Sequence, residues 1–328
     1  MTVSDALPDI IHHLPPDHHG RNLRADVRAG LTGSPKTLPP KWFYDKNGSD
    51  LFEQITKLPE YYPTRAEREV LTNHAESIAA AGPAETLIEL GSGSSRKTPL
   101  LLNALKKAGP LRRYVAVDVS DGALLEARDE LSSAFPDLDL QAVAADFETQ
   151  LHLVPHKGPT LVAFLGGTIG NMEPEARARF LQNVRDLLLP TGGSLLLGTG
   201  LITPPHVLIP AYDDAAGVTA DFNRNVLRVL NTELGADFDV EAFEHAAVWN
   251  PEQEWIEMRL RATRPMLVHL PGINLDVWFQ EGEELRTEIS AKFRTSGIIA
   301  ELEAAQLKTI GQWADEQNQY ALTLAEVD

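Results

Sequence analysis

A regular alternation of short apolar runs and amphipathic runs between residues 65 and 199 constrains the fold more than any other feature of the sequence. The apolar runs are typical of buried strands and occupy residues 86–90, 113–119, 140–147, 160–167 and 192–199. The amphipathic runs have helical periodicity and occupy residues 65–81, 97–108, 122–134 and 174–189. Buried strands that alternate with helices indicate βαβ units, so we predict a doubly wound, mostly parallel sheet of the α/β class.

The chain leaves this alternation after residue 199. Residues 207–234 are largely helical, and at least three extended runs follow between residues 246 and 279, with turn signals at Asn250-Pro251 and Pro271-Gly272. These runs predict an antiparallel patch in a second, α+β unit. A helix at 296–305 and strand patterns at 307–313 and 320–327 suit the end of an open α/β sheet. We therefore expect the α+β unit to be inserted between the fifth strand and the end of the sheet.

The N-terminal segment gives weaker signals. Its first forty or so residues contain four histidines around a Pro-Pro pair, which we interpret as an irregular, partly mobile arm rather than as a metal site. The start of the chain lacks the basic residues and the long apolar run of a signal peptide. No run of about 20 apolar residues predicts a membrane span. We therefore expect a soluble protein.

Composition excludes several partners and chemistries. The 328 residues include 29 Lys and Arg against 47 Asp and Glu, which gives a net charge of −18. Such a charge argues against nucleic acid or an anionic membrane as the main partner. The absence of cysteine excludes disulfides and a thiol nucleophile, and it fits a reducing cytoplasm.

Glycines and carboxylates gather at the ends of the first three predicted strands. Gly91 and Gly93 follow the first strand, and Asp118 and Asp146 come at the ends of the next two. The sequence does not match the dinucleotide-binding fingerprint, because an arginine occupies the position of its third glycine. It does not match the P-loop either, because no Gly-Lys pair occurs. Carboxylates without a phosphate-binding turn suit an adenosine that carries no phosphates, so the predicted cofactor is S-adenosylmethionine (SAM). Asp118 would accept the ribose hydroxyls, and Asp146 and Phe147 would contact the adenine.

The chain resembles the bacterial L-histidine Nα-methyltransferases of ergothioneine biosynthesis in six blocks, which are KWFYDKNGSDLFEQIT, LPEYYPTR, ELGSGSSRKT, FLGGTIGN, YDDAAGVTADFNRNVL and TEISAKF. The resemblance extends from about Arg24 to the C-terminus. One departure is FLGGTIGN, where the family leads us to expect Gly-Ser in place of Gly166-Gly167. The resemblance implies a class I SAM-dependent methyltransferase with a Rossmann-like fold. It also implies three successive methyl transfers from SAM to the α-amino nitrogen of L-histidine, which give hercynine.

The resemblance further implies the residues of the site. The family's cofactor residues map onto Gly91, Lys97, Asp118, Asp146 and Phe147. Its substrate residues map onto Tyr44, Phe52, Tyr61, Asn171, Tyr212, Met258, Glu288 and Ser290. Tyr44 and Asn171 are the expected catalytic residues. An in-line methyl transfer to an amine needs no metal, so none is expected.

Several of these substrate residues have properties that suit the implied chemistry. Tyr61, Tyr212 and Asn171 are neutral donors for the carboxylate and amine, and Tyr44 could orient the amine through water. Glu288 and Ser290 are two residues apart on a strand, so both can face the two imidazole nitrogens. Met258 suits a pocket wall and plain core packing equally well.

We expect a methyltransferase domain made of residues 59–201 plus 290–328 and a histidine-binding domain made of residues 1–58 plus 202–289, in a monomer. The nearest alternative is an N-methyltransferase of another aromatic amino acid, such as tryptophan or a prenylated tryptophan. Glu288 and Ser290 disfavour it, because an indole offers one donor and no acceptor. A non-catalytic SAM-binding domain and a nicotinamide dehydrogenase are the remaining alternatives, and the missing third glycine disfavours the latter.

Overall fold

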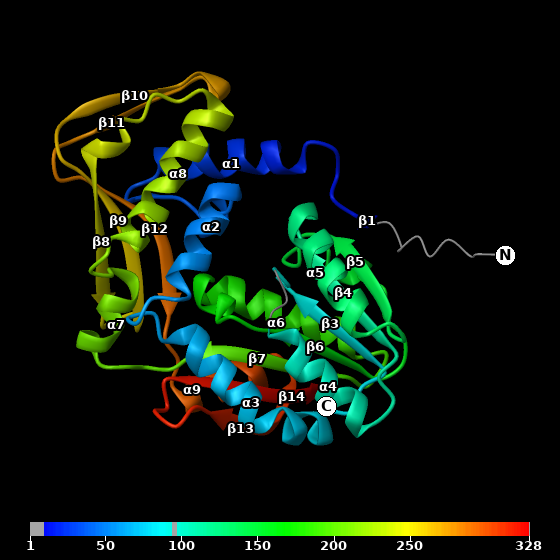
Figure 1. Ribbon diagram of the computed structural model, residues 1–328. Helices are drawn as coiled ribbons and strands as arrows, with labels where there is room; N and C mark the ends of the chain where they lie inside the picture. The colour runs from blue at the N-terminus through cyan, green and yellow to red at the C-terminus, as the bar shows by residue number, and fades with distance from the viewer. Residues whose placement is uncertain (1–9, 94–96, 328) are drawn as a thin grey trace.

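The computed structural model describes residues 10–93 and 97–327, and within this part of the chain the largest sheet has eight strands (Figure 1). In spatial order these are β1 (Ile11–His12), β5 (Asp139–Ala144), β4 (Arg113–Asp118), β3 (Thr86–Leu90), β6 (Thr160–Phe164), β7 (Ser194–Gly200), β14 (Tyr320–Val327) and β13 (Leu307–Ala314). The strands from β1 to β7 pair in parallel, and β14 is antiparallel to both of its neighbours. The predicted doubly wound, mostly parallel sheet is confirmed.

Two apolar cores lie on the two faces of this sheet. Consecutive strand residues point to opposite faces, so Leu87 and Ile88 of β3 belong to different cores. The core around Leu87 includes buried residues of α3 (Pro63–Ala81), α4 (Thr98–Ala108) and α5 (Asp121–Ala134). The core around Ile88 includes buried residues of α6 (Pro174–Leu188) and α9 (Thr295–Ala304). Both faces of the sheet are therefore covered, which leaves its strand ends for binding.

A smaller, four-stranded sheet lies beside the large one (Figure 1). Its strands, in order, are β2 (Lys36–Thr37), β12 (Glu284–Ala291), β9 (Trp255–Ala262) and β8 (Phe243–Asn250). The associated elements are α2 (Lys46–Ile55), α7 (Pro205–Tyr212), α8 (Val218–Leu234) and the hairpin of β10 (Met266–Leu270) and β11 (Leu275–Phe279). All of these except β2 and α2 follow β7 and precede α9 in the chain, which confirms the predicted α+β insertion. The domain limits themselves stay a prediction.

A β-bulge in β12 decides which of its side chains face inward. Leu285 pairs with Leu260, but beyond Thr287 the register shifts by one residue, so that Glu288 pairs with Met258. An extra residue in one strand turns the following side chains to the other face. Glu288 and Ser290 therefore share the face of Leu285, which we call the inner face. Thr287 fixes the bulge, because its hydroxyl shares its one hydrogen between Asn223 Oδ1 of α8 at 2.6 Å and the Met258 carbonyl at 3.0 Å.

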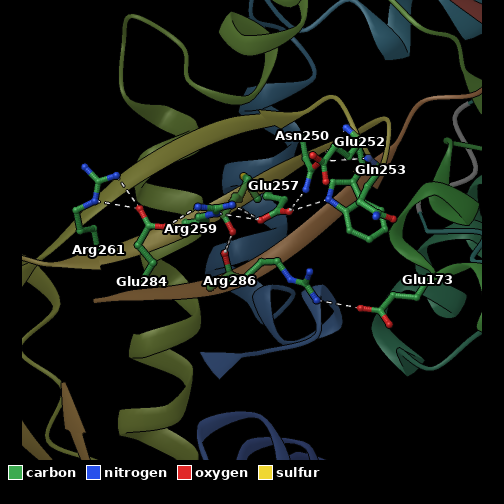
Figure 2. A network of polar contacts seen from close by, with 12 residues as sticks. Glu173, Asn250, Glu252, Gln253, Glu257, Arg259, Arg261, Glu284 and Arg286 are labelled. Carbon is green, nitrogen blue, oxygen red and sulfur yellow. Dashed lines mark hydrogen bonds and ion pairs between the residues drawn. The ribbon is translucent and has the colours of Figure 1, made fainter. Parts of the chain in front are cut away.

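The opposite, outer face of the small sheet carries a ladder of charged side chains (Figure 2). The ion pairs of the ladder are Arg261 to Glu284 at 2.6 Å, Arg259 to Glu284 at 2.6 Å and Arg259 to Glu257 at 2.7 Å. Arg286 lies on the same face and reaches Glu173, directly before α6, at 2.9 Å. Charged ladders of this kind are typical of a solvated surface, so the inner face is the one available for a pocket.

The N-terminal segment corrects one prediction. It forms α1 (His18–Thr32), which buries Leu23, Val27 and Leu31 at a helical spacing of four residues. β1 before it pairs with β5, and β2 after it pairs with β12, so α1 connects the two sheets (Figure 1). The expected irregular arm is wrong for this part of the chain, because the apolar spacing outweighs the prolines before the helix and the histidines around its start.

The described residues contain neither a metal-binding cluster nor a membrane-spanning helix. Between residues 10 and 93 and between 97 and 327, no three His, Asp or Glu side chains converge as a metal ion would require. The same residues contain no helix long and apolar enough to cross a membrane.

Candidate active site

Two glycines form the turn after β3, and the described residues leave space beside it. Gly91 and Gly93 have φ angles of 62° and 49°, which glycine adopts without strain. A Cβ atom on Gly93 would meet no atom of the described residues within 4 Å. A Cβ atom on Gly91 would lie 3.9 Å from the ring of Phe147. Residues 94–96, which follow Gly93 in the sequence, lie outside the described residues. An open glycine turn at the carboxyl end of a parallel strand allows a ligand to approach the backbone.

Asp118 ends β4 directly beside this turn. Its Oδ2 accepts a hydrogen bond from the Gly93 N–H at 3.2 Å, and its Oδ1 accepts one from the Ser120 N–H at 2.9 Å. Burial raises the pKa of Asp118, and the backbone donors at Ser120 and Gly93 oppose that shift. A carboxylate has about four lone-pair sites, more than the backbone donors of the described residues use. The group can therefore accept a further donor, such as a ribose hydroxyl group.

Asp146 and Phe147 follow β5 and complete this edge. The Phe147 ring packs edge to face against Phe164, with ring centroids 5.3 Å apart. Asp146 Oδ1 accepts the Glu148 N–H at 2.9 Å, and Oδ2 lies 3.9 Å from His18 Nε2 of α1. The structure thus brings four of the predicted cofactor residues to one edge of the sheet, namely Gly91, Asp118, Asp146 and Phe147.

Lys97 has a partner that the sequence interpretation missed. It forms an ion pair with Glu67 of α3, which is only 1% exposed. The same carboxylate accepts the Gly166 N–H at 2.6 Å and the Tyr320 hydroxyl at 2.7 Å. Glu67 therefore joins Lys97 to the glycine turn after β6 and to β14. A charged residue within the apolar stripe of α3 was the signal that could have revealed it.

Asn171 connects the large sheet with the inner face of the small sheet. It ends the 3-10 helix η3 (Thr168–Asn171), which follows β6. Its Nδ2 donates to Glu288 Oε1 at 2.8 Å and to the Ile289 carbonyl at 2.7 Å. Burial raises the pKa of Glu288 to about 7, while the Asn171 hydrogen bond and the Lys292 charge oppose the shift. A carboxyl group with such a pKa can change its protonation state near neutral pH.

Tyr212, Ser290 and Lys292 form a buried triangle of polar groups. The Tyr212 hydroxyl lies 2.8 Å from Ser290 Oγ, and Lys292 Nζ donates to both oxygens at 2.8 Å. Burial, and then the charge of Glu288, raise the pKa of Tyr212, so its phenol is neutral. Tyr212 and Ser290 were predicted site residues, whereas Lys292 was missed. Its place two residues after Ser290 in TEISAKF was the available signal.

Aromatic rings form one wall of the site. The predicted residues Tyr44, Phe52, Tyr61 and Tyr212 follow one another at ring-centroid distances of 5.7, 6.1 and 6.2 Å. The ring of Phe222 in α8 lies 5.5 Å from the ring of Tyr44. The predicted site did not include Phe222, although it lies in the block YDDAAGVTADFNRNVL. Tyr44 is 50% exposed as a residue, but burial of its hydroxyl group, and then the charge of Glu288, raise the pKa of its phenol, which is therefore neutral.

Met258 is 2% exposed and pairs directly with Glu288. Side chains that are directly opposite on antiparallel strands lie on one face, so Met258 faces the site while it also packs in the core. Both interpretations of this residue therefore remain compatible with its position.

Comparisons with known proteins agree with this geometry. Residues 23–327 match the profile of the family described as "Histidine-specific methyltransferase, SAM-dependent". The histidine N-alpha-methyltransferase of Mycolicibacterium smegmatis is 53% identical, and the match covers 99% of each chain. The protein of the same name from Mycobacterium tuberculosis is 49% identical over 96% of this chain and 98% of its own. Ergothioneine biosynthesis protein 1 of Neurospora crassa is 31% identical over 72% of this chain, which corresponds to 29% of its own length.

Proposed function

The chain belongs to the family of histidine-specific, SAM-dependent methyltransferases, and from this premise we propose that it methylates the α-amino nitrogen of L-histidine for ergothioneine biosynthesis. We further propose three successive transfers, which give Nα-trimethylhistidine (hercynine). The observation that carries the proposal is the contact of Asn171 with Glu288 at 2.8 Å. It joins polar groups of the small sheet to the end of the large sheet that carries Gly91 and Asp118.

The residues at the edge of the large sheet fit SAM. When bound, SAM supplies a methyl group on a positively charged sulfur, ready for displacement by an amine. Asp118 would hold the ribose hydroxyls, and Phe147 would contact the adenine beside the open turn at Gly91. Lys97 is held by Glu67 and keeps ammonium hydrogens for the anionic carboxylate of the methionine part.

The inner face of the small sheet fits histidine. Glu288 would accept a hydrogen bond from one imidazole nitrogen, and Ser290 would donate to the other. Tyr61, Tyr212 and Asn171 would orient the carboxylate and the amine. Well-oriented reactants lower a barrier by about 7–11 kcal/mol, so positioning of this kind accounts for much of the rate.

The groups around the amine suit repeated methylation. Neutral hydroxyl and amide groups leave room for a nitrogen that gains methyl groups, whereas a carboxylate would hold it as a protonated, unreactive ammonium. Tyr44 would orient the amine through water and help to accept its proton. Its half-exposed side chain supports this role, because the proton must finally reach solvent.

We also propose that the enzyme acts as a cytoplasmic monomer without a metal ion, a nucleic acid or a membrane. Residues 1–58 plus 202–289 would form its histidine-binding domain, and residues 59–201 plus 290–328 its methyltransferase domain. Turnover should be unchanged after treatment with EDTA and dialysis. Size-exclusion chromatography with light scattering should give the mass of one chain.

The direct test is to incubate the purified protein with SAM and each amino acid in turn and to follow the products by mass spectrometry. We expect histidine carrying one, two and finally three added methyl groups. Absence of trimethylated histidine would refute the proposed product. Glu288→Ala should lower histidine turnover far more than SAM affinity. If SAM affinity collapsed instead, the assignment of β12 to the substrate would be wrong.

A further inference from the structure

Lys292 is a buried cation that the proposed chemistry does not use. The residue follows β12, is 6% exposed, and its Nζ lies 5.0 Å from the centre of the Tyr212 ring. Its Nζ lies beside Gly200 at the end of β7, where a Cβ would be in van der Waals contact with it at 3.4 Å. Burial lowers the pKa of Lys292, whereas Tyr62 and Glu288 act in the opposite direction. The nearby Glu288 carboxylate and the Tyr212 ring thus both favour the ammonium form.

The hydrogens of the triangle can be counted. An ammonium group only donates, and each hydroxyl has one hydrogen and two lone pairs. Lys292 therefore uses one lone pair of Tyr212 and one of Ser290. The two hydroxyls are 2.8 Å apart and share one hydrogen between them. A single hydroxyl hydrogen remains for any ligand.

The direction of the shared hydrogen bond follows from acidity. A phenol, with a pKa of about 10, is a far stronger acid than an aliphatic alcohol, so Tyr212 is the better donor. If Tyr212 donates to Ser290, both lone pairs of Ser290 are occupied, one by Lys292 and one by Tyr212. Ser290 can then only donate to the pocket. Without Lys292, either hydroxyl could rotate and offer a lone pair.

We propose that Lys292 is a positioning residue that makes Ser290 a fixed hydrogen-bond donor and thereby selects a ring with an acceptor nitrogen. The proposal deepens the proposed function, because it rests on Ser290 and Glu288 contacting the two nitrogens of an imidazole. Neutral imidazole has one donor and one acceptor nitrogen, whereas a pyrrole or an indole has only the donor. Lys292 would act through Ser290 without touching the substrate.

The test compares histidine with β-(2-pyrrolyl)alanine, whose ring keeps an N–H but lacks the acceptor nitrogen. The ratio of kcat/KM for the two substrates is measured for the unchanged enzyme, Lys292→Met and Lys292→Gln. Met removes every donor, whereas the amide of Gln can still donate to both hydroxyls and serves as the conservative variant in case Met impairs folding. We expect the preference for histidine to fall about 10- to 100-fold in Lys292→Met and by less in Lys292→Gln, with SAM affinity unchanged.

Lys36→Met is the matched control. Lys36 lies on β2 of the same sheet, pairs with Glu283, and its Nζ is 4.9 Å from the centre of the Phe279 ring. The Lys36→Met variant therefore loses a similar cation above an aromatic ring, away from the pocket, and should keep the preference for histidine. In a Ser290→Ala background, the further change Lys292→Met should leave the ratio unaltered, because the donor is already gone.

The outcomes separate the two proposals. If the unchanged enzyme does not methylate histidine, the proposed function is wrong. Suppose that it does methylate histidine. If both Lys292 variants then keep the kcat/KM ratio of the unchanged enzyme, or if Lys36→Met lowers the ratio as much as Lys292→Met does, the inference about Lys292 is wrong and its role is structural.

Discussion

Replacing Glu288 with glutamine should remove a pH dependence from the free energy of unfolding. Burial raises the pKa of this carboxyl group from 4.5 to about 7, so the folded protein holds a proton that the unfolded chain has already lost. The contribution of Glu288 to the free energy of unfolding is therefore highest below pH 4.5, the pKa in the unfolded chain, and declines as the pH rises to about 7, the pKa in the folded protein. Glutamine does not titrate, and its Oε1 can still accept from Asn171. The variant should gain stability relative to the unchanged protein as the pH rises.

The structure sets the size of this effect. One pKa unit corresponds to about 1.4 kcal/mol, so a pKa raised from 4.5 to about 7 corresponds to about 3 kcal/mol at most. The Glu288 side chain is half-buried, and solvent screens part of its charge. We therefore expect the difference in unfolding free energy between variant and unchanged protein to change by about 1–3 kcal/mol between pH 5 and pH 8.

Urea unfolding of the ligand-free proteins, at several pH values in this range, measures the difference directly. Glu244→Gln removes the same charge from an exposed position on β8 of the same sheet and serves as the control. A difference for Glu288→Gln that is constant with pH, or that changes in the opposite direction, would refute the reasoning. It would mean that Glu288 is ionised in the folded protein well below neutral pH.

Three further predictions concern other contacts of the site. Phe147→Ala should weaken SAM binding about tenfold, because it removes the ring beside the glycine turn; an unchanged Kd by calorimetry would exclude the ring from the cofactor site. Glu67→Gln should destabilise the protein by about 1–3 kcal/mol, since Lys97 loses its charged partner; urea unfolding would show no change if the pair contributes nothing. Asn171→Ala should raise the KM for histidine about tenfold with little effect on the Kd for SAM, because the contact with Glu288 is lost. An equal rise in the KM for histidine and the Kd for SAM would contradict the assignment of Asn171 to the substrate site.

The large sheet was predictable because local patterns specify it. Its strands are buried on both faces and alternate with helices, and each of these signals lies within a few residues. The predicted end of the third strand is wrong: it was expected at residue 147, whereas β5 ends at Ala144. Asp146 turns the chain there by accepting the Glu148 N–H. A polar side chain that bonds its own backbone thus ends a strand that hydrophobicity alone would extend.

The site was predictable in unequal parts. Parallel strands bring their carboxyl ends to one edge, so Asp118 and Asp146 could be placed together from their spacing alone. The contact of Asn171 with Glu288 joins residues 117 positions apart, and no local pattern reveals it. Only the resemblance to a family linked those two residues in advance. Lys292 and Glu67 were missed because a charged residue in a sequence normally indicates a solvated surface.

The bulge at Thr287 makes the count of residues in β12 as important as their identity. Substitutions along this strand change single contacts of the pocket, but pairing β12 with β9 in one continuous register, without the bulge, would exchange the two faces of the strand. Ile289 and Ala291 would then line the pocket, and Glu288 and Ser290 would lie on the side that now carries the charged ladder. The one extra residue at the bulge is therefore as important to the pocket as the side chains that line it.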